Sequence, residues 1–218
     1  LEQLEEQFKA AESSPEPSGK QVPYPFNTAA SMLEMAKKSG LTIAEMQRHN
    51  EHTVLSEDKL ETSLADIWKT MEDCVSRGLA QDGILPGGLN VKRRAPSIAR
   101  QLQEEWGINR INPMAANEWL QVYAMAVNEE NAAGGKIVTA PTNGAAGVVP
   151  AVLSYLLKFY PETSTDHIAR FLLTAAAIGG IIKHNASISG AEVGCQGEVG
   201  SASAMAAAGM AAMLGGSP

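Results

Sequence analysis

The feature that most constrains this fold is the abundance of small residues in the C-terminal third of the chain. Residues 198–214 read EVGSASAMAAAGMAAML, and the 218-residue chain holds 20 glycines while aromatic residues make up only 5%. An interior made of such residues is built from small and aliphatic side chains, and it favours helices whose backbones approach closely. We therefore predict an all-α fold, a compact helical domain whose Ala/Gly-rich central helices are buried.

Start and stop signals for helices recur along the rest of the chain. The first predicted helix is capped by Asn27 or Thr28 and ends at Gly40, the second opens with the capping box of Thr42 and Glu45 and ends near His52, and the third is capped by Ser56 and ends at Gly78. A fourth ends near Trp106, and a fifth runs from after Pro113 to Asn131. Two nearly all-apolar helices over 147–160 and 163–183 and a small-residue helix over 198–214 follow. The only strand-like segment is Lys136–Ala140, which is too short to anchor a sheet.

Composition along the chain indicates one domain behind a linker. Residues 13–25, SSPEPSGKQVPYP, are rich in Pro, Ser and Gly, which is typical of a linker. We therefore place an N-terminal segment and interdomain linker at 1–23 and the main domain at 24–218. The chain opens at Leu1 rather than Met and stops after a turn-like GGSP, so we expect a fragment of a longer protein.

Charge and cysteine content exclude several classes of protein. A net charge of −7 disfavours nucleic-acid binding, which needs a concentrated Lys/Arg surface. Two cysteines are too few for a disulfide framework, and this indicates a reducing compartment such as the cytoplasm. The longest apolar stretches, such as Phe171–Ile182, are interrupted by glycine and are predicted to be too short to span a membrane.

Two segments interrupt the helical pattern in a way that packing does not require. The first, 134–147, reads GGKIVTAPTNGAAG, with glycines on both sides of a polar cluster and a predicted helix directly behind it. Backbone N–H groups and hydroxyls at a helix N-terminus suit an anionic ligand such as a carboxylate. The alternative is a tight interhelical loop in which Thr142 and Asn143 serve only as caps.

The second segment, 183–198, reads KHNASISGAEVGCQGE and joins two apolar helices, so we predict that it lies deep in the molecule. Unpaired buried polar groups cost about 1–3 kcal/mol each, which indicates a function for so polar a run. Cys195 precedes an Ala-rich helix whose N-terminus favours a thiolate. It is a nucleophile, a metal or cluster ligand, or an inert thiol. His184 is either a base or a hydrogen-bonded core histidine.

Residues outside these two segments have simpler interpretations. Cys74 lies inside an ordinary amphipathic helix and is predicted to belong to the core. Lys92, Arg93 and Arg94 end a Gly/Pro-rich loop over 82–96 and are predicted to be solvated. The alternative is that one of these arginines clamps a substrate carboxylate.

The two polar segments resemble a known family. TAPTNGAAGVVPA at 139–151 and NASISGAEVGCQGEVG at 185–200 closely resemble the catalytic α domain of iron–sulfur-dependent L-serine dehydratases. The segments PGGLNVKRRAP and YPFNTAASMLEMA are similar to that family as well, and the resemblance covers residues 24–218. It implies a lyase that removes water and then ammonia from L-serine to give pyruvate.

The resemblance also implies a cofactor and further protein parts. Family members hold a [4Fe–4S] cluster on three cysteines and leave one iron open as a Lewis acid for the substrate. Cys195 matches the first ligand, and the other two are expected beyond Pro218, so residues 24–218 are expected to be a catalytic α domain truncated before them. A smaller β domain, in the same chain or as a subunit, is implied, and a homodimer is expected.

The substrate-binding residues are expected in the first segment. Thr139, Thr142 and Asn143 would hold the carboxylate or the amino group of L-serine.

The second segment is expected to line the same pocket through His184, Asn185 and Ser187, with His184 as one candidate for proton transfer. Glu198 would bind the ammonium group or tune the cluster, and a base from the β domain is the alternative to His184. Two other functions stay open: a related iron–sulfur lyase for threonine or cysteine, and a non-catalytic helical fragment that alone cannot hold a three-cysteine site.

Overall fold

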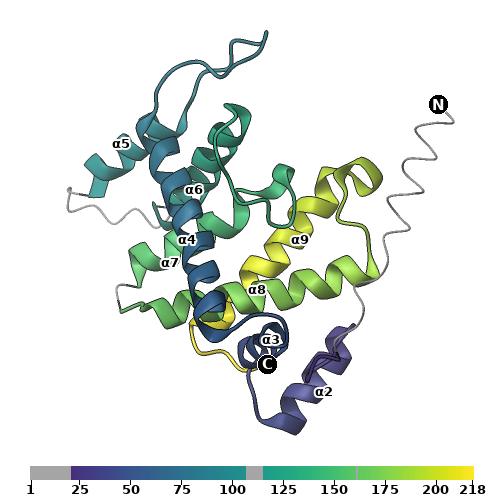
Figure 1. The fold of residues 1–218 in the computed structure, drawn as a ribbon. Coiled ribbons are helices and arrows are strands. Elements are labelled where there is room, and N and C mark those ends of the chain that lie inside the picture. Colours follow the sequence, from purple (N-terminus) through teal and green to yellow (C-terminus); the bar gives the residue numbers. More distant parts are fainter. Residues whose placement is uncertain (1–20, 107–114, 161) are drawn as a thin grey trace, which may run out of the picture.

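The computed structural model describes residues 21–106, 115–160 and 162–218, and within these ranges the regular structure is helical (Figure 1). The elements are α2 (Ala29–Ser39), α3 (Ile43–Glu51), α4 (Glu57–Ala80), α5 (Ala95–Trp106), α6 (Ala115–Ala132), the short 3₁₀ helix η1 (Asn143–Ala145), α7 (Val148–Phe159), α8 (Thr165–Asn185) and α9 (Gly190–Met213). Across the described ranges, β pairing is limited to one isolated bridge between Ile84 and Lys92. The predicted all-α fold is therefore confirmed. Most of the predicted 1–23 segment lies outside the described residues.

The first two helices begin where local sequence predicts. The Thr28 and Thr42 hydroxyls accept the backbone N–H groups of the residues three positions on, at 3.1 Å and 3.2 Å. Gly40 ends α2 in the left-handed conformation, with φ at 71°. These caps satisfy backbone groups that a helix end leaves unpaired, so each helix is bounded by its own neighbouring residues.

Gly78 does not end α4, contrary to the sequence prediction. The helix continues to Ala80, and Gly78 is buried within it. A Cβ atom at Gly78 would lie 2.3 Å from the carbonyl oxygen of Ala126 on α6. Gly78 therefore allows the backbones of α4 and α6 to touch, and this packing role replaces the predicted role as a helix stop.

The centre of the molecule is built from small residues, as predicted. Helices α8 and α9 follow each other across a short connection and pack side by side (Figure 1). A Cβ atom at Gly209 would lie 2.9 Å from the ring of Phe171, which is fully buried. Ala202 and Ala206 on α9 are buried as well, and Ala206 belongs to the same apolar cluster as Phe171. The Ala/Gly-rich helices thus form the close-packed centre.

Helix α8 has the length that the sequence predicts, shifted by two residues to Thr165–Asn185. Among the described helices it alone passes a test of length and hydropathy for a membrane-spanning helix, a test that a buried core helix also passes. The predicted apolar stretch Phe171–Ile182 is the middle part of this helix. Phe171, Leu173 and Ala175 of α8 pack into the main apolar cluster, which α4, α7 and α9 complete.

The α4–α6 contact gives a stability prediction. Substituting G78A in an exposed helix would stabilise it by about 1 kcal/mol, because alanine has the higher helix propensity. Here we expect destabilisation of about 1–3 kcal/mol, since the added methyl group meets backbone that has no room to move. Chemical denaturation measures the difference. The control is G88A, whose added Cβ has no neighbour within 4 Å. Equal stability of the two variants would contradict the contact.

Candidate active site

The two polar segments meet at Glu198. The hydroxyl of Thr142, just before η1, donates a hydrogen bond of 2.8 Å to Oε1 of Glu198 on α9. The two residues are 56 positions apart, and both are partly buried. The structure therefore brings the TAPTNG and GCQGE motifs together at one point, as the prediction of a shared pocket requires.

Two glycines make room for the Glu198 carboxylate. A Cβ atom at Gly144 would lie 2.5 Å from Oε2 of Glu198, and one at Gly190 would lie 2.6 Å from the same carboxylate. Neither glycine has a positive φ angle, and an added Cβ at either position would push aside the flexible end of the Glu198 side chain. The carboxylate is thus enclosed between the backbones of the two motifs.

The first segment is fixed to α6 and exposes its polar side chains. The Asn143 carbonyl accepts a hydrogen bond of 2.9 Å from Nδ2 of Asn131, at the end of α6. Gly147 lies against α6 as well, because a Cβ there would be 2.7 Å from the Ala124 carbonyl oxygen. Thr139 and Asn143 are exposed, so both side chains are open to a ligand.

The second segment is neither a long loop nor buried, contrary to prediction. Its first residues end α8, positions 186–189 make the connection, and α9 already begins at Gly190. His184, Asn185 and Cys195 are exposed, while Ser187 and Glu198 are partly buried. The segment follows an apolar helix, but it forms the outer end of the α8–α9 pair, with η1 packed against the start of α9.

A break inside α9 places Cys195. Gly194 has φ at 75° and ψ at 169°, which is not helical and favours glycine. Cys195 follows directly and is the first residue of the part of α9 beyond the break. A helix that restarts at this point leaves its first N–H groups without intrahelical partners near Cys195. Glu198 follows three positions later, on the same side of the helix.

The described residues provide one candidate thiol for a cluster. They hold no group of three or more His, Cys, Asp or Glu side chains arranged for a metal ion. Cys74 is buried in α4 beside Leu102 and Trp119, and burial raises the pKa of its thiol. It is a core residue, as predicted. Cys195 fits a single ligand position, so the described residues alone cannot supply the three thiolates of the expected cluster.

His184 and Asn185 contact a different part of the molecule from the Thr142–Glu198 pair. Nδ2 of Asn185 donates to the Asn27 carbonyl at 2.6 Å, and His184 lines a cavity of about 720 Å³ together with Tyr24 and Asn50. Ser187 accepts a hydrogen bond of 3.1 Å from the backbone N–H of Ser189. Within the described ranges, no hydrogen bond or ion pair joins these three predicted site residues to Thr142 or Glu198.

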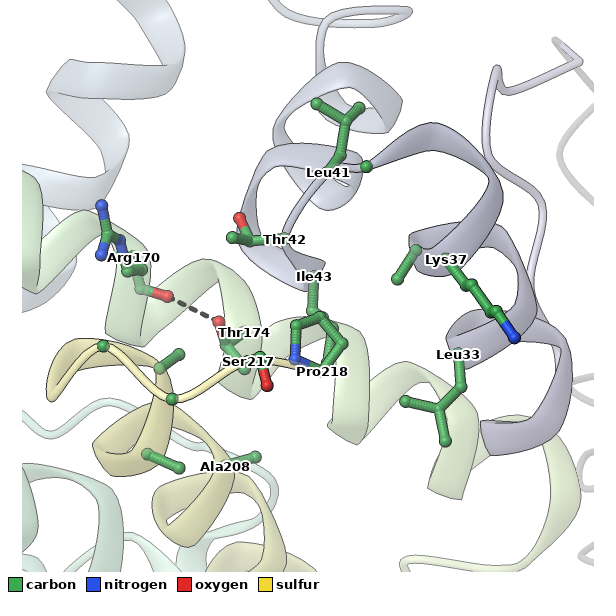
Figure 2. A pocket seen from close by; sticks show the side chains of 16 residues that line it. Leu33, Lys37, Leu41, Thr42, Ile43, Arg170, Thr174, Ala208, Ser217 and Pro218 are labelled. Atoms are coloured by element: carbon green, nitrogen blue, oxygen red, sulfur yellow. Dashed lines mark hydrogen bonds between the residues drawn. The ribbon is translucent and has the colours of Figure 1, made fainter.

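A larger cavity lies elsewhere, and none of the predicted site residues lines it. It measures about 880 Å³ and is bounded by α2, the start of α3, α8 and the residues that follow α9. Figure 2 shows its lining, in which Leu33, Ile43 and Pro218 face the space. The Thr174 hydroxyl donates to the Arg170 carbonyl at 2.8 Å, a bond internal to α8. Cavity size therefore does not identify the site.

The sequence interpretation missed a buried ionic group beside the first segment. Glu130 on α6 is 2% exposed and pairs with two arginines. Its Oε1 accepts from Nη1 of Arg93 at 2.8 Å, and its Oε2 accepts from Nε of Arg77 at 3.0 Å. Lys92 and Arg94 are exposed as predicted, but Arg93 is buried and clamps a carboxylate of its own chain. The sequence signal that could have revealed this ionic group is the pair of acidic residues, Glu129 and Glu130, near the end of an otherwise apolar helix.

Comparison with known proteins identifies the family of this chain. Residues 38–218 match the family described as serine dehydratase alpha chain, and the chain belongs to that family. It is 55% identical to L-serine dehydratase of Streptomyces coelicolor over 196 residues, which cover 89% of this chain and 42% of the relative. It is 48% identical to L-serine dehydratase 2 of Escherichia coli over 214 residues, or 98% of this chain and 46% of the relative. The chain thus spans less than half the length of these relatives.

The two cysteines are expected to differ in reactivity. In metal-free protein near pH 8, a thiol reagent should label Cys195 quickly, because that thiol is exposed. Cys74 should react only slowly or after unfolding, since burial hides it and raises its pKa, which lowers its thiolate fraction. Mass spectrometry of the two peptides measures both rates. Equal rates under native conditions would contradict the burial of Cys74.

The Thr142–Glu198 bond is expected to couple the two motifs energetically. In a double-mutant cycle of T142V and E198A, we expect a coupling free energy of about 1–2 kcal/mol, because the bond joins a hydroxyl to a charged group. Urea unfolding of the four proteins measures it. The control cycle pairs E198A with T139V, whose exposed side chain does not contact Glu198, and it should be additive. Additive behaviour of both cycles would argue against the bond.

Proposed function

We propose that the protein containing this chain is an L-serine ammonia-lyase, which removes water and then ammonia from L-serine to give pyruvate. The observation that carries the proposal is the Thr142–Glu198 hydrogen bond of 2.8 Å, because it joins two motifs at a point next to an exposed cysteine. The names of the relatives, which are L-serine dehydratases, support the same reaction for the whole protein.

The exposed residues of the first segment would hold the amino acid. Thr139 and Asn143 present a hydroxyl and an amide to solvent, and these groups suit the carboxylate of L-serine. The Thr142 hydroxyl already donates to Glu198, so it would orient that carboxylate rather than donate to the substrate. The Glu198 carboxylate would hold the ammonium group.

Cys195 would be one ligand of a [4Fe–4S] cluster, and the two further cysteines would come from parts of the protein outside this sequence. The bound cluster would supply a Lewis acid to the substrate hydroxyl. The α-proton must then leave to a base. His184 is the proposed candidate from this chain, with Asn185 and Ser187 on the same exposed end of the α8–α9 pair. A base from a β domain remains the alternative proposal.

The proposed surroundings follow from the size of the relatives. This chain corresponds to 42% of one relative and 46% of another, which leaves room for a β domain in the same chain or as a subunit. We further propose that the protein is cytoplasmic, because two cysteines without a disulfide framework indicate a reducing compartment. The family resemblance implies a homodimer, which we also propose.

The test is the C195A variant of the full-length protein, reconstituted with iron and sulfide under anaerobic conditions. We expect loss of the brown cluster absorbance and of pyruvate formation, because one thiolate ligand is missing. The control is C74A, which should keep both. Threonine as substrate, with 2-oxobutanoate as product, measures specificity in the same assay. Wild-type-like cluster content and activity in C195A would refute the ligand assignment.

A further inference from the structure

The end of α6 holds three separate segments through three consecutive side chains. Glu129 accepts the backbone N–H of Arg94 at 2.7 Å and that of Ala95 at 3.3 Å, which caps the start of α5. Asn131 donates to the Asn143 carbonyl at 2.9 Å. Glu130, between them, accepts hydrogen bonds from Arg77 and Arg93. The first polar segment, which runs from 134 to 147, begins directly after this cluster.

Glu130 is buried with both of its oxygens in use. A carboxylate removed from water is costly unless charged donors satisfy it. Arg77 from α4 and Arg93 from the loop before α5 are these donors. The Arg93 side chain is almost fully buried, whereas that of Arg77 is 38% exposed. The two arginines therefore share one partner but differ in their surroundings.

Of the two arginines, only Arg77 also bonds to the first polar segment. Its Nη2 donates to the Lys136 carbonyl at 2.8 Å while its Nε holds Glu130. The segment also lies against Glu130 itself: the Gly135 N–H donates to the Glu130 carbonyl at 2.9 Å, and a Cβ at Gly135 would be 2.8 Å from the Glu130 carboxylate. The near end of the segment is thus fixed by Arg77 and Glu130, and the far end by Asn131.

We propose that Arg77 is a positioning residue for the substrate-binding segment. It fixes residues 136–143 and thereby sets where Thr139 and Asn143 stand, without touching the substrate. A planar guanidinium makes both of its bonds at once, whereas a lysine ammonium in the same place acts as a single point charge. The kinetic part of this proposal rests on the proposed function, while the structural part does not.

The test compares R77K with R93K in the full-length protein. Both variants keep the charge beside Glu130, and both should melt at a lower temperature than the wild type. Only R77K should speed backbone hydrogen exchange in the peptide 137–146, because only Arg77, of the two arginines, bonds to the Lys136 carbonyl that directly precedes this peptide. Only R77K should raise the KM for L-serine, by about three- to tenfold, with cluster absorbance unchanged. The R77Q variant, which keeps one amide donor, is the second variant should R77K fail to fold.

The matched control is R100Q, which removes an exposed arginine–carboxylate pair with Asp82 that lies away from the segment. It should change neither exchange nor KM. Identical exchange and KM in R77K and R93K would overturn the proposal, since both arginines would then serve folding alone. Faster exchange in R77K together with a wild-type protein inactive on L-serine would uphold the positioning role and refute the proposed function.

Discussion

The arrangement of this molecule depends on one buried carboxylate. Glu130 is buried, where an unpaired charge would be costly, and Arg77 and Arg93 together satisfy both of its oxygens. Those arginines come from α4 and from the loop before α5, and Arg77 extends the contact to Lys136. Helix α4, helix α6, the α5 entry and the substrate-binding segment are thereby fixed relative to one another. Breaking such a buried pair typically costs about 3–5 kcal/mol.

Several other close contacts between elements depend on glycines, which have no side chain to keep the elements apart. Gly78 lets α4 touch the backbone of α6, Gly147 does the same between η1 and α6, and Gly209 admits the ring of Phe171. These contacts have little tolerance, because a closely packed interior does not adjust to an added methyl group without strain. A rigid scaffold of this kind lets a short segment such as 136–143 hold its geometry without regular structure of its own.

Features that depend on residues close together in the chain, such as helix caps, were predicted from the sequence. Features that depend on contacts between distant residues were missed. The caps at Thr28 and Thr42 involve partners three residues away, so they were correctly placed. Gly78 was misread because a glycine that ends a helix and one that admits another backbone look the same in sequence. Arg93 was misread because its partner lies 37 positions further on. The motifs around Thr142 and Glu198 could be grouped by resemblance, but their hydrogen bond and the exposure of Cys195 depend on how α8 and α9 pack.

The enclosure of Glu198 has a consequence for how this site can change over evolutionary time. The same carboxylate lies within 2.6 Å of the position that a Cβ atom would take at Gly144 or at Gly190, so a larger residue at either one must push the end of the Glu198 side chain aside. The three positions are therefore coupled, because the room for a larger residue at either glycine depends on where the side chain at 198 lies. A displaced Glu198 carboxylate would lose the hydrogen bond from Thr142, so a substitution at either glycine weakens the contact between the two motifs.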